Sequence, residues 1–93
     1  PQAEVLLTLG AQGMRWIKGE QIIDQPAYRV EVVDTVGCGD ASMGGWIASQ
    51  LRQPDAPTQM HLQCAAAGAA IAASKAGAYA ATWEEVQAMI ARG

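Results

Sequence analysis

Two closely spaced glycines and an acidic residue stand in "VVDTVGCGDASMGGWIASQL", residues 32–51, as Gly37, Gly39 and Asp40. Glycine lets the backbone turn tightly and approach a bound group closely. The apolar residues after Asp40 have the spacing of a helix, so a helix is expected to begin here. The N-terminus of a helix binds phosphate through its free N–H groups and partial positive charge. The amides of residues 37–40 would form an anion hole, with the Asp40 carboxylate placed to accept a proton from an attacking hydroxyl group. An ordinary helix N-cap at Asp40 is the alternative interpretation.

The composition bounds the class of protein that could carry this motif. The 93 residues make at most one domain, and 51% hydrophobic against 16% charged residues predicts a packed interior. A formal net charge of −3 argues against a nucleic-acid partner, and no apolar run is long enough to cross a membrane. Neither a signal-peptide pattern nor a cysteine framework is evident, since the chain has only Cys38 and Cys64. We therefore expect a cytoplasmic protein.

Strand patterns precede the motif and should position it. The apolar run of residues 4–9, bounded by Gly10, predicts a strand of a parallel sheet that is buried on both faces. Residues 14–25 resemble a hairpin that turns at Lys18-Gly19, and residues 28–35 alternate well enough for another strand.

Helix patterns follow the motif. One helix is expected over residues 40–53, and a second runs from Thr58 as N-cap to about Lys75, with Gly77 as its C-terminal cap. The first helix carries apolar residues at helical spacing, namely Met43, Trp46, Ile47 and Leu51.

The C-terminal part has a capping box and a strong alanine bias. Thr82 and Glu85 predict the start of a last helix over residues 83–92. The alanine-rich residues 64–81 are compatible with close packing of a helix on a sheet, or with a surface for a flat ligand such as a nucleobase.

Five further residues have ordinary interpretations. His61 is expected on a helix surface, and Cys38 is expected to pack, although a helix N-terminus lowers a thiol pKa. Core or interface roles are expected for the tryptophans, Trp16, Trp46 and Trp83.

The N-terminal strand needs neighbours that the pattern does not supply. A doubly buried parallel strand at residues 4–9 requires crossover helices, and none precedes it. We expect residues 1–93 to be the C-terminal part of a longer α/β protein.

Three segments in order resemble one known family. "DTVGCGDASMGG" is similar to the signature D-T-x-G-A-G-D-x-F of the ribokinase-like (PfkB-type) sugar kinases. "VLLTLGAQG" resembles the nucleotide-binding segment of that family, and "AAAGAAIAASKAGA" resembles its alanine-rich helix with a terminal Gly-Ala. The resemblance covers most of the chain and corresponds to the C-terminal third of such an enzyme.

The resemblance implies roles for particular residues. Asp40 matches the catalytic base, and the anion hole matches Gly37, Cys38 and Gly39. Residues that match the ATP site are Thr8, Gly10, Gly13 and Ala66. A monovalent-cation site is implied at Asp34 and at Val36, Ala72, Lys75 and Gly77.

The chain departs from the family pattern at three positions. Cys38 replaces the usual alanine, and Ser42 stands where an aromatic residue is common, which would loosen packing. Ala81 stands where some members have a serine that binds the cation, so the cation site is the least secure of these transfers.

The resemblance also implies a fold and an activity. We expect an α/β, Rossmann-like three-layer sandwich of the ribokinase type that phosphorylates a sugar, with fructose as the first candidate, using ATP, Mg²⁺ and a K⁺ ion. A homodimer is expected for the longer protein. Since the family's sugar contacts lie mostly upstream of Pro1, residues 1–93 alone should be inactive. Open alternatives are a kinase for a nucleoside or sugar acid, a non-catalytic module that binds nucleotides or anions, and a purely structural piece.

Overall fold

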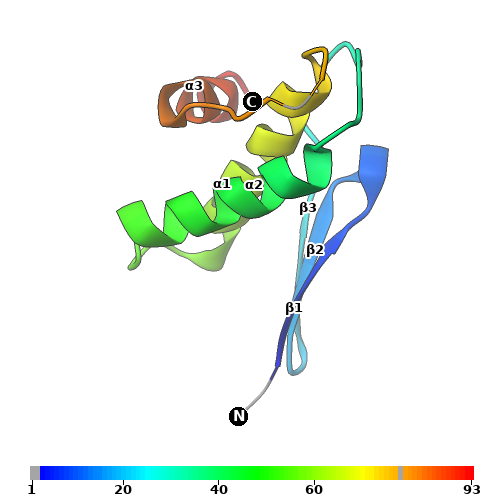
Figure 1. The fold of residues 1–93 in the computed structure, drawn as a ribbon. Coiled ribbons are helices and arrows are strands. Elements are labelled where there is room, and N and C mark those ends of the chain that lie inside the picture. The colour runs from blue at the N-terminus through cyan, green and yellow to red at the C-terminus, as the bar shows by residue number, and fades with distance from the viewer. Residues whose placement is uncertain (1–2, 78) are drawn as a thin grey trace.

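The structure of the protein, a computed structural model, describes residues 3–77 and 79–93. A three-stranded antiparallel sheet in the order β1-β2-β3 is followed by three helices (Figure 1). The elements are β1 (Glu4–Thr8), the 3₁₀ turn η1 (Gly10–Gln12), β2 (Met14–Lys18), β3 (Gln21–Gln25), α1 (Cys38–Arg52), α2 (Thr58–Ala73) and α3 (Trp83–Arg92). No helix in the described residues has the length and apolar character needed to cross a membrane.

The predicted hairpin over residues 14–25 is confirmed. Strands β2 and β3 pair antiparallel, with Lys18 opposite Gln21, and Gly19 takes a positive φ of 60° in the turn. Arg15 and Asp24 face each other across the strands and form an exposed ion pair with an Nε–Oδ1 distance of 2.6 Å.

The prediction of a doubly buried parallel strand at residues 4–9 is wrong for the described chain. Strand β1 pairs antiparallel with β2, and four of its five residues are exposed, while Leu6 packs on the core. A continuous apolar run indicates burial of both faces only where layers cover both, and here the core covers one face.

The predicted strand at residues 28–35 is not observed either. These residues lie outside regular structure, and Val32 and Val33 are 62% and 57% exposed. The backbone N–H groups of Val33 and Asp34 both donate to the carbonyl of Ala73, at 2.8 and 3.1 Å, in place of a strand ladder. An alternating sequence forms a strand only when a neighbour supplies that ladder.

The helices differ from expectation mainly at their ends. Helix α1 begins two residues earlier than predicted, with Gly37 as N-cap. In α2 the N-cap is Pro57, so Thr58 is the first helical residue and makes no capping hydrogen bond. That helix ends at Ala73 rather than near Lys75, because Ser74 caps it and its hydroxyl donates to Ile71 O at 2.7 Å.

Helix α3 matches the prediction in bounds and mechanism. Thr82 Oγ1 accepts from the Glu85 N–H at 3.1 Å, and the Glu85 carboxylate accepts from the Thr82 N–H at 2.9 Å. These reciprocal bonds satisfy two N–H groups that a helix start leaves unpaired.

Small residues bring α1 and α2 into close contact. A Cβ built on Gly45 would lie 2.5 Å from the carbonyl oxygen of Cys64, and one on Gly68 would lie 2.8 Å from that of Ala41. Close approach of the two helices therefore depends on these glycines, and α2 is the central element, with α1, α3 and the sheet around it (Figure 1).

The expected apolar stripe on α1 is only partly buried. Trp46 is in the core, but Met43, Ile47 and Leu51 are exposed, and the other buried residues of the helix are Ser42 and Ser49. Close approach to α2 selects small side chains, so the large apolar ones point away from it.

His61 is buried, which corrects its expected position on a helix surface. Its Nδ1 lies 2.7 Å from Ser49 Oγ, which also accepts from Gln53 Nε2 at 2.9 Å. The indole of Trp46 packs edge-on against the imidazole at a centroid distance of 5.8 Å. Trp16 is also in the core as expected.

Candidate active site at the first turn of α1

The first turn of α1 presents unpaired backbone donors. Gly37 takes a positive φ of 80°, and the Cys38 N–H donates to Thr35 O at 3.3 Å. Within the described residues, the N–H groups of Gly37, Gly39 and Asp40 have no acceptor. Such donors, together with the helix dipole, suit an anion.

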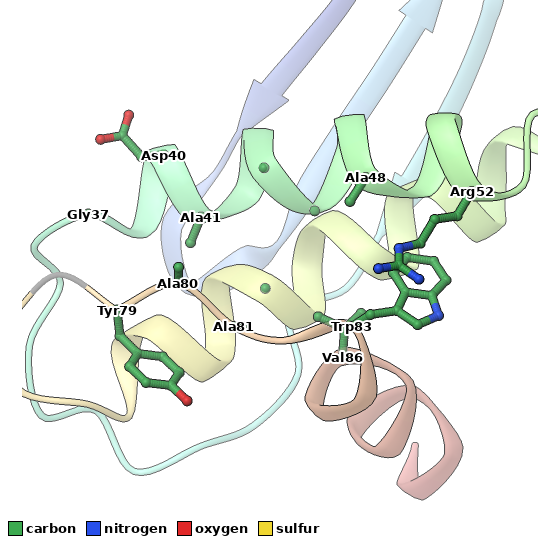
Figure 2. Close-up of a pocket in the computed structure, with 13 residues that line it drawn as sticks. Gly37, Asp40, Ala41, Ala48, Arg52, Tyr79, Ala80, Ala81, Trp83 and Val86 are labelled. Atoms are coloured by element: carbon green, nitrogen blue, oxygen red, sulfur yellow. The ribbon is translucent and has the colours of Figure 1, made fainter.

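Asp40 is not the N-cap that the alternative interpretation required. Gly37 holds that position, and no side chain caps the helix start. Asp40 is exposed in the first turn, and its carboxylate points away from Tyr79 and Ala80 toward the open side (Figure 2). It is therefore accessible to a reactant.

One pocket collects the residues expected at the ATP site. It has a volume of about 330 Å³ and lies between the β1–β2 connection, α1 and α2. Its lining includes every residue expected at the ATP site and two of the anion hole, namely Thr8, Gly10, Gly13, Ala66, Cys38 and Gly39. A Cβ on Gly39 would meet no protein atom within 4 Å, so this backbone faces open space that a ligand can fill.

The inner wall of this pocket, which we call the nucleotide pocket, is mostly apolar. Four alanines of α2 form one side, at positions 66, 69, 70 and 73. Tyr28, Val30 and Val32 line the pocket from the irregular segment before α1. Burial raises the pKa of the Tyr28 hydroxyl, so it remains protonated at neutral pH.

A second pocket, which we call the C-terminal pocket, lies across the same turn. Its volume is about 520 Å³, and it is lined by Gly37 and Asp40 together with α1, α2 and residues 79–86 (Figure 2). The Arg52 guanidinium stacks over the Trp83 ring, 5.0 Å from its centroid. The sequence interpretation missed Arg52 and Tyr79 here, because no local motif links these distant segments.

The residues expected at a cation site meet at one corner. The Asp34 carboxylate accepts from the N–H of Val36 and of Gly77, both at 3.0 Å, and the Lys75 N–H donates to Ala72 O at 3.1 Å. The hydrogen bonds from Val36 and Gly77, of which the one from Val36 has the larger effect, hold the pKa of Asp34 below its ordinary value. Gly77 does not cap α2, but its positive φ of 74° turns the chain toward Asp34.

A network of polar side chains anchors the wall of the C-terminal pocket. The Tyr79 hydroxyl donates to both carboxylate oxygens of Glu85, at 2.8 and 3.0 Å. Hydrogen bonds from the Thr82 N–H, which has the larger effect, and from the Tyr79 hydroxyl lower the pKa of Glu85. The hydrogen bond to the Glu85 carboxylate in turn raises the pKa of Tyr79. The capping box predicted the Thr82 contact, whereas the Tyr79 contact had no sequence signal.

The described residues contain no group of three or more His, Cys, Asp or Glu side chains that could hold a metal ion. A divalent ion at the first turn of α1 (residues 37–40), which we call the anion-binding turn, would therefore depend on phosphate oxygens for most of its ligands.

Comparison with known proteins identifies a family for this sequence. Residues 1–85 match the model of the pfkB family carbohydrate kinases. The 1-phosphofructokinase of Escherichia coli K12 is 38% identical over 77 residues, which cover 81% of this chain and 24% of that protein.

Two solved structures share the fold. One from E. coli, assigned as ribokinase II and bound to ATP and Mg²⁺, superposes with a TM-score of 0.86 at 32% identity, covering 97% of this chain and 29% of that one. The other is the aminoimidazole riboside kinase of Salmonella enterica, complexed with aminoimidazole riboside and an ATP analogue. It superposes with a TM-score of 0.82 at 29% identity, covering 94% of this chain and 31% of that one.

The chain thus spans between about a quarter and a third of the length of these relatives. Its sheet and helices form an α/β arrangement shared with ribokinase-fold kinases. The family match extends over nearly all of the sequence. The chain belongs to the pfkB family of carbohydrate kinases.

Proposed function

We propose that this chain forms the ATP-side, C-terminal part of a kinase that transfers a phosphoryl group from ATP to a sugar hydroxyl. The observation that carries the proposal is the first turn of α1, where unpaired N–H groups lie between a pocket and an exposed carboxylate. The N–H groups of Gly37 and Gly39, with the Cys38 backbone, would stabilise charge on the transferring group.

Asp40 acts as the general base in this proposal. It accepts the proton of the sugar hydroxyl as the hydroxyl oxygen forms a bond to the terminal phosphorus of ATP, while the bond from that phosphorus to the bridging oxygen breaks and ADP leaves. The exposed position of Asp40 leaves room for an acceptor beside it.

The nucleotide pocket would hold ATP. Thr8, Gly10 and Gly13 bring the β1–β2 connection against the pocket, and Ala66 lies in its alanine wall. Positive φ values of 59° at Gly10 and 109° at Gly13 fit a tight turn close to a ligand. Mg²⁺ bound to the phosphates would neutralise their charge.

The Asp34 corner is the proposed place for a monovalent cation. The carbonyls of Val36, Ala72, Lys75 and Gly77 lie on the two segments that Asp34 joins. A carboxylate and carbonyl oxygens are suitable ligands for K⁺, although Asp34 already accepts two N–H groups. The ion would act on the anion hole from behind.

The acceptor is proposed to be a sugar of the fructose type. The E. coli relative is named 1-phosphofructokinase, which favours fructose or its phosphate, and the riboside kinase of S. enterica favours a nucleoside as the second candidate. We further propose a complete three-layer sandwich, a homodimer and a cytoplasmic location for the intact protein.

The direct test is a coupled assay for ADP release by the intact protein with ATP and a panel of acceptors. The panel contains fructose, fructose 1-phosphate, ribose, a nucleoside and a sugar acid. We expect the highest kcat/KM for a fructose compound. Preference for the nucleoside would favour the second candidate, and ATP binding without turnover of any acceptor would indicate a non-catalytic module.

A further inference from the structure

The nucleotide pocket is lined by a buried serine whose hydroxyl group has no hydrogen-bond partner among the described residues. Ser42 is 4% exposed. In the two described ranges, Ser49 and Ser74 hydrogen-bond to other residues, whereas Ser42 Oγ does not. Every fully buried side-chain oxygen or nitrogen in these ranges has a hydrogen-bond partner. Because Ser42 Oγ has none, it is not fully buried and must be partly accessible. The accessible space beside Ser42 is the nucleotide pocket, which it lines.

The surroundings of Ser42 suit a flat, apolar ring. The alanines at 66, 69, 70 and 73 follow the spacing of one helix face, so they present a smooth wall with little bulk. Tyr28 lines the pocket beside it and also contacts both core clusters, which restrains the ring. The other hydroxyl groups of the pocket belong to less buried residues, since Thr8 and Thr35 are exposed and Tyr28 is half-buried.

Ser42 also has a defined place relative to the anion-binding turn. Cys38 and Ser42 are four residues apart on α1, so they share a face and are separated by about one turn, ~5.4 Å. Both line the nucleotide pocket, whereas Asp40 lines the C-terminal pocket. A nucleotide whose terminal phosphate sits at the turn would therefore place its remaining groups on the Ser42 side.

We propose that Ser42 recognises the nucleobase, its hydroxyl pairing with the polar edge of a purine held against the alanine wall. This inference rests on the proposed function and assigns a specificity role within it. A buried polar group in a mostly apolar pocket helps to fix the orientation of a ligand and discriminates against ligands that lack its partner.

The test compares three variants of the intact protein, Ser42→Ala, Ser42→Thr and Ser49→Ala. Calorimetry measures binding of ATP and of inorganic tripolyphosphate, which has the phosphates but no base. Ser42→Ala should weaken ATP binding about two- to tenfold, the usual effect of one hydrogen bond, and leave tripolyphosphate binding unchanged. Ser42→Thr keeps the hydroxyl and should bind ATP almost as well as the unaltered protein.

Ser49→Ala is the matched control, because Ser49 is buried on the same helix but bonds to His61 outside the pocket. It should lower stability without changing ATP affinity. Equal ATP affinity of Ser42→Ala and the unaltered protein would overturn the inference alone, as would an equal loss for ATP and tripolyphosphate. Failure of the unaltered protein to bind ATP would refute the proposed function, and the inference with it.

Discussion

The two pockets beside the first turn of α1 differ in how their residues are connected. The nucleotide pocket gathers segments that resemble family motifs, and its inner wall is made of small apolar residues. The C-terminal pocket gathers Asp40, Arg52, Tyr79 and Trp83, which share no motif; Arg52 stacks on Trp83, and Tyr79 is held by a hydrogen bond to Glu85. One helical turn thus separates a surface suited to a nucleotide from an open side suited to an acceptor.

The largest effect is expected at Asp40, on the acceptor side. Asp40→Asn is nearly isosteric and removes the proton acceptor, so turnover of the intact protein should fall by roughly 10²- to 10⁴-fold, the usual contribution of a general base. ATP affinity should be unchanged, because Asp40 is not among the residues that line the nucleotide pocket. Steady-state kinetics and calorimetry measure both. Turnover within threefold of the unaltered protein would exclude Asp40 as the base.

Gly39 tests the turn itself. A Cβ there meets no protein atom within 4 Å and its φ is not positive, so Gly39→Val should fold, while its side chain fills the space beside the unpaired N–H groups. We expect turnover to fall by about 100-fold, as for loss of an anion-hole donor, and ATP affinity to fall much less. The reverse pattern, lost affinity with normal turnover of bound substrate, would exclude an anion hole.

Adjacent glycines of α1 test the small-residue contact between α1 and α2. Gly45→Ala places a Cβ 2.5 Å from Cys64 O, so it should lower the free energy of unfolding by about 1–3 kcal/mol. Gly44→Ala is the matched control, because its Cβ meets nothing within 4 Å, and it should raise stability by about 0.5–1 kcal/mol. Urea unfolding measures both. Equal effects would mean that the helices are not in close contact.

The sequence predicted those parts of the molecule that depend on local chemistry. The hairpin, α1 and α3 are set by turn residues, helical spacing and the Thr82 capping box, and all are present. Thr8, Gly10 and Gly13 share a pocket for the same reason, since one motif keeps them in fixed local geometry, whereas Ala66 comes from α2 and was assigned to the ATP site by the family resemblance alone.

Features that depend on distant neighbours were not predicted. Residues 28–35 have a strand pattern, but the carbonyl of Ala73 accepts from two of their N–H groups and no strand pairs with them in the described chain. The burial of His61 was not predicted, because its hydrogen-bond partner, Ser49, lies on another helix. Periodicity shows that a helix has an apolar face, but not which side approaches a neighbour.

The smallest effect is expected at the Asp34 corner. Because N–H groups of Val36 and Gly77 lower the pKa of Asp34 below 3.8, its stabilising contribution is present above that value and is lost as the pH falls through the lower, folded-state pKa. Asp34→Asn should therefore lower stability at neutral pH, and the difference from the unaltered protein should shrink below about pH 4. Thermal melts over a pH series measure it. A difference that is constant with pH would exclude this linkage.

Photoaffinity labelling with 8-azido-ATP, followed by trypsin digestion and mass spectrometry, tests the separation of the two pockets most directly. Cleavage at Arg29 and Lys75 separates Tyr28 of the nucleotide pocket from residues 79–86 of the C-terminal pocket, whereas peptides 30–52 and 53–75 carry residues of both pockets. The account predicts labels that ATP displaces on peptide 19–29, which carries Tyr28, and none on peptide 76–92. Displaceable labelling confined to peptide 76–92 would place the nucleotide in the C-terminal pocket and contradict the account.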